Sequence, residues 1–178
     1  MTFDREEVEA AFRAYWRLGA VDENWDVWCD TCFTEDVVYV EHILGIKQGR
    51  ETVRAWIKPT MVDYGEIYTA YEWHMVDDTG RVVAYMQNRR DNPEPGAPPI
   101  DFPGITVLQY AGGRQFSVEE DFWSLPEAAA AFKEYVEQCK QFDPDFRHKR
   151  TRRNWGNGPD WTKGASSYAE SDGAKNGA

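Results

Sequence analysis

The residues with the clearest chemical potential lie in the segment DVVYVEHILGIKQG, residues 36–49. Its apolar start is typical of a strand. Side chains alternate between the two faces of a strand, so Tyr39 and Glu41 share one face and His42 lies on the other. A carboxylate at the end of an apolar strand is either solvated at the rim of a sheet or desolvated in a cavity. Because desolvation raises a carboxyl pKa and suits the group to accept a proton, we expect Glu41 to be a general base.

Four other titratable residues lie on later predicted strands: His74, Arg89, Asp91 and Asp121. His74 is able to shuttle a proton near neutral pH if its face of the strand lines a cavity. Arg89 held by Asp91 is able to stabilise an oxyanion, and the alternative is an ordinary ion pair at a sheet end. Asp121 is a second candidate for the base. His42 and Asp91 are expected among the substrate contacts.

Aromatic residues are abundant, at 15% of the chain with eight Trp. Large amphipathic rings suit pockets as well as cores. We expect Tyr15 and Tyr39 to act as hydroxyl donors, and Trp56 and Trp73 to contact an apolar substrate. No dinucleotide fingerprint, phosphate-binding loop, zinc-protease motif or nucleophile elbow is present, so neither a nucleotide, a flavin nor a metal cofactor is predicted.

Charge and hydropathy narrow the function classes further. The net charge of −11 argues against nucleic acid as a partner, because binding to phosphates needs a basic face. No basic, apolar leader and no apolar run of membrane-spanning length is present, which predicts a cytoplasmic protein with no membrane partner. Cys29 and Cys32 form a C-x-x-C pair without a second ligand pair, and they share the apolar face of a predicted helix. Core packing is therefore expected for both, rather than redox chemistry or zinc binding.

Hydrophobic periodicity divides the chain into helices followed by strands. Helical spacing predicts helices at about 4–19, at 22–33 and after Gly49, the last bent or reset at Pro59. Period-two patterns predict strands at 36–42, 67–76, 81–91, 102–110 and 115–123. The sequence SLPE at 124–127 is a capping box that opens a final helix ending near Phe142.

This order predicts an α+β fold of one domain. We expect a cone-shaped α+β barrel, in which a curved, mainly antiparallel sheet rolls around the N-terminal helices and leaves a cavity at one end. The domain is expected to span residues 1–145, including the helix 124–142. Residues 146–178 form a basic, polar and flexible tail with the run RHKRTRR. Its Trp155 and Trp161 suggest that it wraps a neighbouring subunit or covers the mouth of the pocket.

The chain resembles the SnoaL-like branch of the nuclear transport factor 2-like superfamily. The segments that carry the resemblance are FRAYWRLGAVDENWD, FTEDVVYVEHILGIKQGRETVRAWI and SVEEDFW, and it covers residues 5 to 125. The resemblance implies small acid–base enzymes, a pocket for a bulky apolar or aromatic molecule, and homodimers or higher homo-oligomers.

Two branches of the superfamily offer comparisons of single residues. The base and pocket tyrosine of ketosteroid isomerases fall on Glu41 and Tyr15, and their second oxyanion-hole group falls on Thr106. The motifs of limonene-epoxide-hydrolase-like enzymes fall on Tyr39-x-Glu41, Arg89-x-Asp91 and Asp121. Both patterns depart from their families, with Thr106 in place of a carboxylic acid and Glu41 in place of an asparagine.

Together these features predict a cofactor-independent lyase or isomerase that acts on a bulky hydrophobic, aromatic small molecule. The alternatives are an epoxide hydrolase that uses Arg89, Asp91 and Asp121, and a non-catalytic module for ligand binding or dimerisation.

Overall fold

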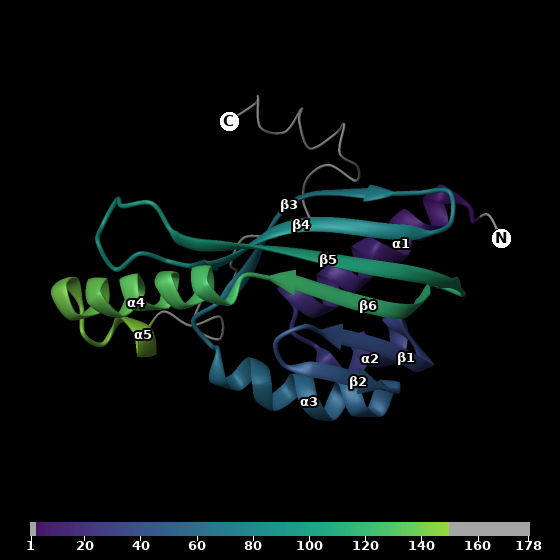
Figure 1. Cartoon of the computed structure of the whole chain (residues 1–178), viewed down its shortest axis with the longest axis horizontal. Coiled ribbons are helices and arrows are strands. Elements are labelled where there is room, and N and C mark those ends of the chain that lie inside the picture. The colour runs from purple at the N-terminus through teal and green to yellow at the C-terminus, as the bar shows by residue number, and fades with distance from the viewer. Residues whose placement is uncertain (1–2, 150–178) are drawn as a thin grey trace.

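The computed structural model describes residues 3–149, and the sheet is its central feature (Figure 1). Six strands lie in the order β2-β1-β6-β5-β4-β3. All neighbours are antiparallel except β1 and β6, which run parallel. The strands are Phe33–Glu41 (β1), Gly45–Gln48 (β2), Tyr68–Val76 (β3), Arg81–Arg90 (β4), Ile100–Gly112 (β5) and Gln115–Trp123 (β6). The sheet is curved and unclosed, which confirms the predicted α+β class.

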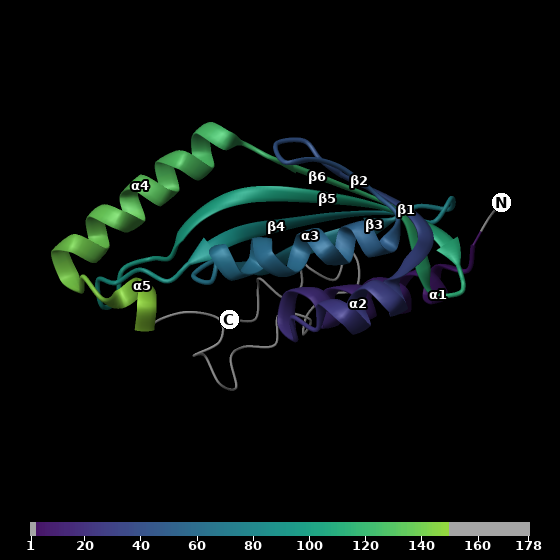
Figure 2. The same cartoon turned by 90° about the horizontal axis from the view of Figure 1, so that it is seen from below.

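Three helices lie against the concave face of the sheet, and a fourth lies at the end of the arch (Figure 2). The helical segments are Arg5–Trp16 (α1), the π-helical turn Arg17–Val21 (η1), Trp25–Cys32 (α2), Arg50–Asp63 (α3), Leu125–Phe142 (α4) and Phe146–Lys149 (α5). As the capping box predicts, the Ser124 side chain accepts a hydrogen bond from the backbone N–H of Glu127. Helix α3 continues past Pro59 to Asp63.

Three boundaries differ from the sequence prediction. The helix predicted to end at Phe33 stops one residue earlier, because Phe33 has extended backbone angles and already pairs with Phe116 of β6. The turn predicted between Gly45 and Gly49 contains the short strand β2. Residues 146–149, predicted as the start of the tail, form α5; residues 150–178, with Trp155 and Trp161, lie outside the described residues.

Two hydrophobic clusters hold these layers together. The larger joins α1, α2 and α3 to the sheet, with Phe12, Trp28 and Phe116 each at most 3% exposed. The smaller joins α4 to the start of β5 through Ile100, Phe102, Ala131, Tyr135 and Cys139. Cys29 and Cys32 are free thiols buried in α2, as the core-packing prediction requires. Burial raises the pKa of both thiols to about 12, so neither is a thiolate at neutral pH.

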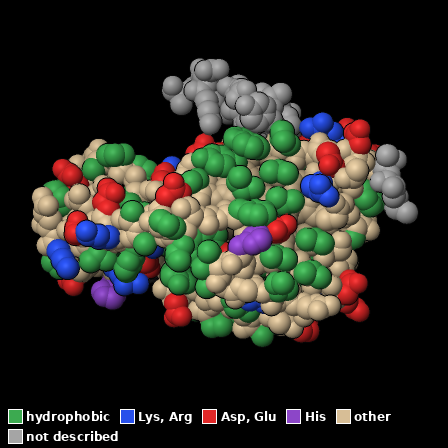
Figure 3. All heavy atoms as spheres, in the orientation of Figure 1, with side chains coloured by type: hydrophobic (Ala, Val, Ile, Leu, Met, Phe, Trp, Pro, Cys, Tyr) green, Lys and Arg blue, Asp and Glu red, His purple; other side chains and the backbone are tan. Residues whose placement is uncertain are grey.

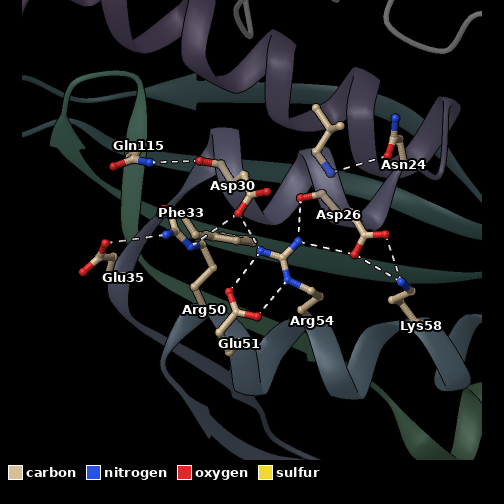
Figure 4. A network of polar contacts seen from close by, with 11 residues as sticks. Asn24, Asp26, Asp30, Phe33, Glu35, Arg50, Glu51, Arg54, Lys58 and Gln115 are labelled. Carbon is tan, nitrogen blue, oxygen red and sulfur yellow. Dashed lines mark hydrogen bonds and ion pairs between the residues drawn. The ribbon is translucent and has the colours of Figure 1, made fainter.

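A polar network fixes α2 against α3 (Figure 4). Arg54 donates hydrogen bonds to Asp30 at 2.6 Å, to the backbone carbonyl of Asp26 at 2.8 Å and to Glu51 at 3.1 Å. Lys58 adds a contact of 2.9 Å to Asp26. This network lies on the outside of the helices and positions α3, which carries part of the cavity wall.

Exposed apolar side chains gather on the face of the molecule seen in Figure 3. Residues with large exposed apolar side chains near β1, β2, β5 and β6 are Ile43, Leu44, Ile46, Ile105 and Phe122. The predicted homo-oligomer stays a prediction. Within residues 3–149, no helix is both long and apolar enough to cross a membrane.

Candidate active site

A cavity of about 550 Å³ lies between the concave face of the sheet and the helices. Its wall is mostly apolar, with Trp16, Trp56, Met86 and Phe102 among the residues that line it. Polar groups are few and come from particular strands. An enclosed apolar space with a few convergent polar groups is the usual form of a small-molecule site.

Two carboxyl side chains of β6, Glu119 and Asp121, line one part of the cavity. They are two residues apart on one strand and therefore point to the same face. Parallel pairing with β1 sets Tyr39 beside Glu119 and Glu41 beside Asp121. Three carboxyl groups thus meet in the wall.

Asp121 is held by two hydroxyl groups. Thr106 donates to Oδ1 at 2.5 Å, and the Tyr39 hydroxyl donates to Oδ2. Burial raises the pKa of Asp121 to about 6, although both hydroxyl donors act in the opposite direction and favour the carboxylate. The group is therefore mostly ionised at neutral pH, yet far more basic than a solvated aspartate.

Glu119 is 1% exposed and accepts a hydrogen bond of 2.6 Å from the Tyr15 hydroxyl. Its pKa is raised well above the ordinary value, first by burial and then by the neighbouring charge of Asp121. Both effects favour the neutral carboxylic acid over the carboxylate. In the part of the chain that the structure describes, Glu119 Oε2 is buried and has no hydrogen-bond partner. Burial also raises the pKa values of Tyr15 and Tyr39, which remain hydroxyl donors.

Glu41 lines the same cavity, but its oxygens are occupied by the protein itself. Oε2 accepts the backbone N–H groups of Ile43 at 3.0 Å and Leu44 at 2.5 Å, and Oε1 accepts the indole N–H of Trp123. Lys47 donates to the carbonyl oxygens of Leu44 and Gly45 in the same turn. The predicted base is therefore a side chain that holds the β1–β2 turn together.

His74 does not line the cavity. It is 1% exposed and packs beneath α1, where Nε2 lies 2.6 Å from Glu9 and Nδ1 lies 2.7 Å from the Tyr71 hydroxyl. Both ring nitrogens are occupied away from the cavity, so the predicted proton shuttle has no access to a bound substrate.

Arg89 and Asp91 also lie outside the cavity wall. Arg89 pairs with Asp101 on β5 through hydrogen bonds of 2.6 and 2.9 Å, and Asp91 accepts a hydrogen bond from Tyr68. The predicted Arg89–Asp91–Asp121 set is not assembled, because the strand turns Arg89 to the outer face. Its neighbour Arg90 points inward and lines the cavity.

Of the remaining predicted contacts, Trp56 and Thr106 line the cavity. Trp73 is stacked on Tyr85, its partner in β4, with ring centroids 5.5 Å apart, and does not line it. His42 pairs with Glu120 at 2.7 Å and is about half exposed, on the face opposite to Glu41 as alternation predicts. Neither Trp73 nor His42 lines the cavity, so neither contacts a substrate bound there.

Sequence reasoning missed Glu119 and Arg90 as members of the site. The signal for Glu119 was its position two residues before Asp121, which sets both on one face. The signal for Arg90 was the alternation of Val82, Ala84 and Met86, which are buried and continue to Arg90 on the inner face. Among the described residues, no group of three or more His, Cys, Asp or Glu side chains is arranged to hold a metal ion.

Comparison with known proteins shows which solved structures have the same fold. The sequence matches no protein-family model, and no curated protein matches it. Solved structures do match. One is a candidate polyketide cyclase from Xanthomonas campestris, 19% identical with a TM-score of 0.57, covering 71% of this chain and 97% of that one.

Two further structures widen the comparison. A protein with a ketosteroid isomerase-like fold from Catenulispora acidiphila, in complex with trimethylamine, is 22% identical with a TM-score of 0.51, covering 65% and 87% of the two chains. An LEH-like epoxide hydrolase from M. tuberculosis is 12% identical with a TM-score of 0.57, covering 74% and 93%. The chain therefore has the α+β fold of these solved structures, which include a SnoaL-like polyketide cyclase, a ketosteroid isomerase-like protein and an LEH-like epoxide hydrolase.

Proposed function

We propose that the protein is a cofactor-independent acid–base enzyme, a lyase or isomerase, acting on a bulky hydrophobic small molecule with an aromatic or alicyclic body. The observation that carries the proposal is the Glu119–Asp121 pair. Two carboxyl groups on one strand share an apolar cavity, and burial raises the pKa of both, that of Asp121 to about 6 and that of Glu119 well above its ordinary value. Environments that separate the pKa values of neighbouring groups are typical of acid–base sites.

The reaction begins with Asp121 as the general base. Its carboxylate takes a proton from a carbon atom next to a substrate carbonyl group, and the electron pair of the broken C–H bond moves to the carbonyl oxygen. The Tyr15 and Tyr39 hydroxyls, which here donate to Glu119 and Asp121, turn to the substrate oxygen and supply the hydrogen bonds that stabilise this developing enolate, with the neutral Glu119 carboxyl group beside them. Return of the proton to another carbon completes an isomerisation, and expulsion of a leaving group from the neighbouring carbon completes a lyase reaction.

The named neighbours support this class without assigning a substrate. The structures that match include candidate polyketide cyclases, an epoxide hydrolase and an epoxide hydrolase/cyclase-like enzyme from pyran ring formation in salinomycin. A cytoplasmic location and a homodimer or higher homo-oligomer belong to the same proposal.

Deuterium exchange tests the proposal without knowledge of the product. A panel of aromatic and polycyclic ketones is incubated with the protein in D₂O, and loss of the C–H signal next to the carbonyl is followed by NMR. We expect exchange of at least one ketone above the uncatalysed rate. Removing a general base costs about 10²–10⁴-fold, so Asp121→Asn should reduce exchange by that factor.

The matched control is Asp36→Asn, which makes the same chemical change at an exposed position of β1. Its exchange rate should stay within about twofold of the unchanged protein. Exchange that survives in Asp121→Asn, or that is absent for every ketone of the panel, would contradict the proposal.

Epoxide hydrolysis is the second candidate, favoured by the same neutral and ionised carboxyl pair. Glu119 would protonate the epoxide oxygen while Asp121 activates water. Incubation of cyclic epoxides in ¹⁸O-labelled water distinguishes the two candidates, because only hydrolysis produces a labelled diol. A purely ligand-binding module is the remaining candidate, and it predicts neither exchange nor diol formation.

A further inference from the structure

The cavity has a second polar region, formed by Glu66, Arg90 and Arg147. Arg90 ends β4, Glu66 precedes β3 and Arg147 lies in α5. Arg90 and Glu66 are 3% and 4% exposed. This region is distinct from the carboxyl pair, because Thr106 beside Asp121 pairs with Ala84, six residues before Arg90 on β4. At about 3.3 Å per residue, the two regions lie roughly 20 Å apart along the strand.

The buried guanidinium group of Arg90 has unused donors. Within residues 3–149, its Nε and Nη1 atoms are buried and have no hydrogen-bond partner, and Oε1 of Glu66 is likewise unpartnered. Glu66 Oε1 lies 3.6 Å from Arg90 Nε and 3.5 Å from Arg147 Nη2. At these separations the charged groups form ion pairs, because the distances are too long for hydrogen bonds. A buried donor without a partner is costly, so such a donor in a native structure is explained by strain, by a functional role or by a bound water or ion.

The surroundings of Arg90 fix its position without using these donors. Its guanidinium carbon lies 5.4 Å from the ring centre of Phe132 and 5.5 Å from that of Tyr135, both on α4. Arg147 lies 5.7 Å from the same Phe132 ring. The three charged side chains carry two positive charges and one negative charge. One further negative charge would neutralise the cluster.

We propose that Arg90, with Arg147, binds a carboxylate of the substrate, so that the substrate class is an apolar, ring-bearing acid. A carboxylate accepts two parallel hydrogen bonds from the Nη1–Nη2 edge or the Nε–Nη2 edge of a guanidinium group, and each edge of Arg90 includes one of its unpartnered donors. The apolar wall between the two regions, which includes Trp56, Met86 and Phe102, contacts the body of the molecule. This inference rests on the proposed function in that the same cavity is the substrate site, with the reacting carbon near Asp121 and the carboxylate at Arg90.

Binding measurements test the carboxylate subsite directly. The probes are three acids that differ in spacer length, biphenyl-4-carboxylate, biphenyl-4-ylacetate and 3-(biphenyl-4-yl)propanoate, each paired with its uncharged primary amide. Dissociation constants are measured by isothermal titration calorimetry at pH 7.5. We expect at least one acid to bind ten times more tightly than its amide.

Variants of two adjacent arginines then separate local recognition from general charge. Arg90→Met should bring the affinity for the acid down to that for the amide, while affinity for the amide stays within about twofold. Arg89→Met removes the same charge one residue away on the outer face, and it should preserve the preference for the acid. Arg90→Lys keeps the charge without the planar fork, so it should show an intermediate preference and covers the case in which Arg90→Met does not fold.

Three results would overturn the inference: equal affinity for acid and amide with every spacer, equal weakening of both probes by Arg90→Met, or equal loss in Arg89→Met and Arg90→Met. The test is independent of turnover, because Asp121→Asn leaves Arg90 intact. Acid preference without ketone exchange would overturn the proposed reaction alone, and exchange without acid preference would overturn the subsite alone.

Discussion

Glu41 and Asp121 show how the partners of a buried carboxylate decide its role. Glu41 accepts hydrogen bonds from three N–H groups, two of them from its own turn, so its side chain stabilises the local backbone. Asp121 accepts only hydroxyl groups, which are able to rotate towards a ligand, and its raised pKa makes it a useful base. The sequence predicted both residues in one cavity, but it carried no information on which of them the backbone would occupy.

Glu41→Gln tests the structural role of that side chain. Glutamine has one acceptor oxygen and adds an amide donor that faces other donors, so buried N–H groups lose their partner. We expect a loss of about 2–3 kcal/mol in the free energy of unfolding, measured with urea, and little change in ketone exchange. Glu35→Gln, at a side chain 91% exposed, is the control and should change stability by less than about 0.5 kcal/mol.

The pKa of Asp121 also predicts how stability and activity depend on pH. Because the folded-state pKa of about 6 exceeds the ordinary 3.8, the folded protein binds more protons than the unfolded chain between these values. Its free energy of unfolding therefore falls as pH rises through this window. From pH 5 to 7.5 the protein should lose about 1–2 kcal/mol relative to Asp121→Asn, measured by urea unfolding. Exchange activity should rise with pH, with a midpoint near the same pKa of about 6; a flat profile would contradict the role of this base.

At the scale of elements, two irregularities in the strands decide which side chains face the helices. The β3–β4 register skips Glu72, so Tyr71 and His74 both point inward while Trp73 points outward. The β5–β6 register skips Ser117, which separates the buried Phe116 from the outward-facing side chains of Val118 and Glu120. A bulge shifts the phase of a strand by one residue, so strict alternation along β3 or β6 does not give the faces of all their side chains.

The elements themselves were more predictable than their faces. Helical spacing located the helices around Phe12, Trp28 and Val53 because each one buries an apolar stripe, and the capping box located α4. The shared face of Val82, Ala84, Met86 and Arg90 follows from alternation, but the sequence left open whether that face lines a cavity. Pairing with β5 sets Arg90 opposite the buried Ile100 and resolves the choice.

Gly19 in the π-helical turn η1 lies against the ring of Trp28, and both residues line the cavity. A Cβ atom at position 19 would lie 2.8 Å from Trp28 Nε1 and 3.2 Å from two ring carbons. We expect Gly19→Ala to cost about 1–3 kcal/mol of unfolding free energy, although the same change in an open helix stabilises. In a Trp28→Phe background the smaller ring leaves room, so the cost should shrink; an equal cost in both backgrounds would exclude this contact as the cause.

At the scale of the whole molecule, α4 extends the cavity beyond the sheet. It contributes Leu125, Ala128, Ala129 and Phe132 to the cavity wall, and its own small core attaches it to β5. Figure 2 shows α4 running from the end of β6 toward the far end of the β4–β5 arm. The helix therefore supports the Arg90 region without contributing to the Glu119–Asp121 pair.

Tyr135→Ala tests this division of the molecule into two parts. Tyr135 is 1% exposed at the centre of the smaller core, so its truncation should destabilise α4 by about 3–5 kcal/mol. Hydrogen exchange should then accelerate along α4 and leave β6 protected. Lys133→Ala, at an exposed position of the same helix, is the control. It should change neither the stability of α4 nor its hydrogen exchange. Faster exchange throughout the sheet would show that the two cores unfold as one unit.

The central claim is that one carboxyl group of the pair is neutral and the other ionised at pH 7. Carboxyl ¹³C chemical shifts, followed from pH 3 to 9 in protein labelled at Asp and Glu and assigned with Asp121→Asn and Glu119→Gln, measure this most directly. The account predicts a midpoint of about 6 for Asp121 and a Glu119 signal that remains that of the protonated acid at pH 7. Titration of both groups near pH 4 would contradict it.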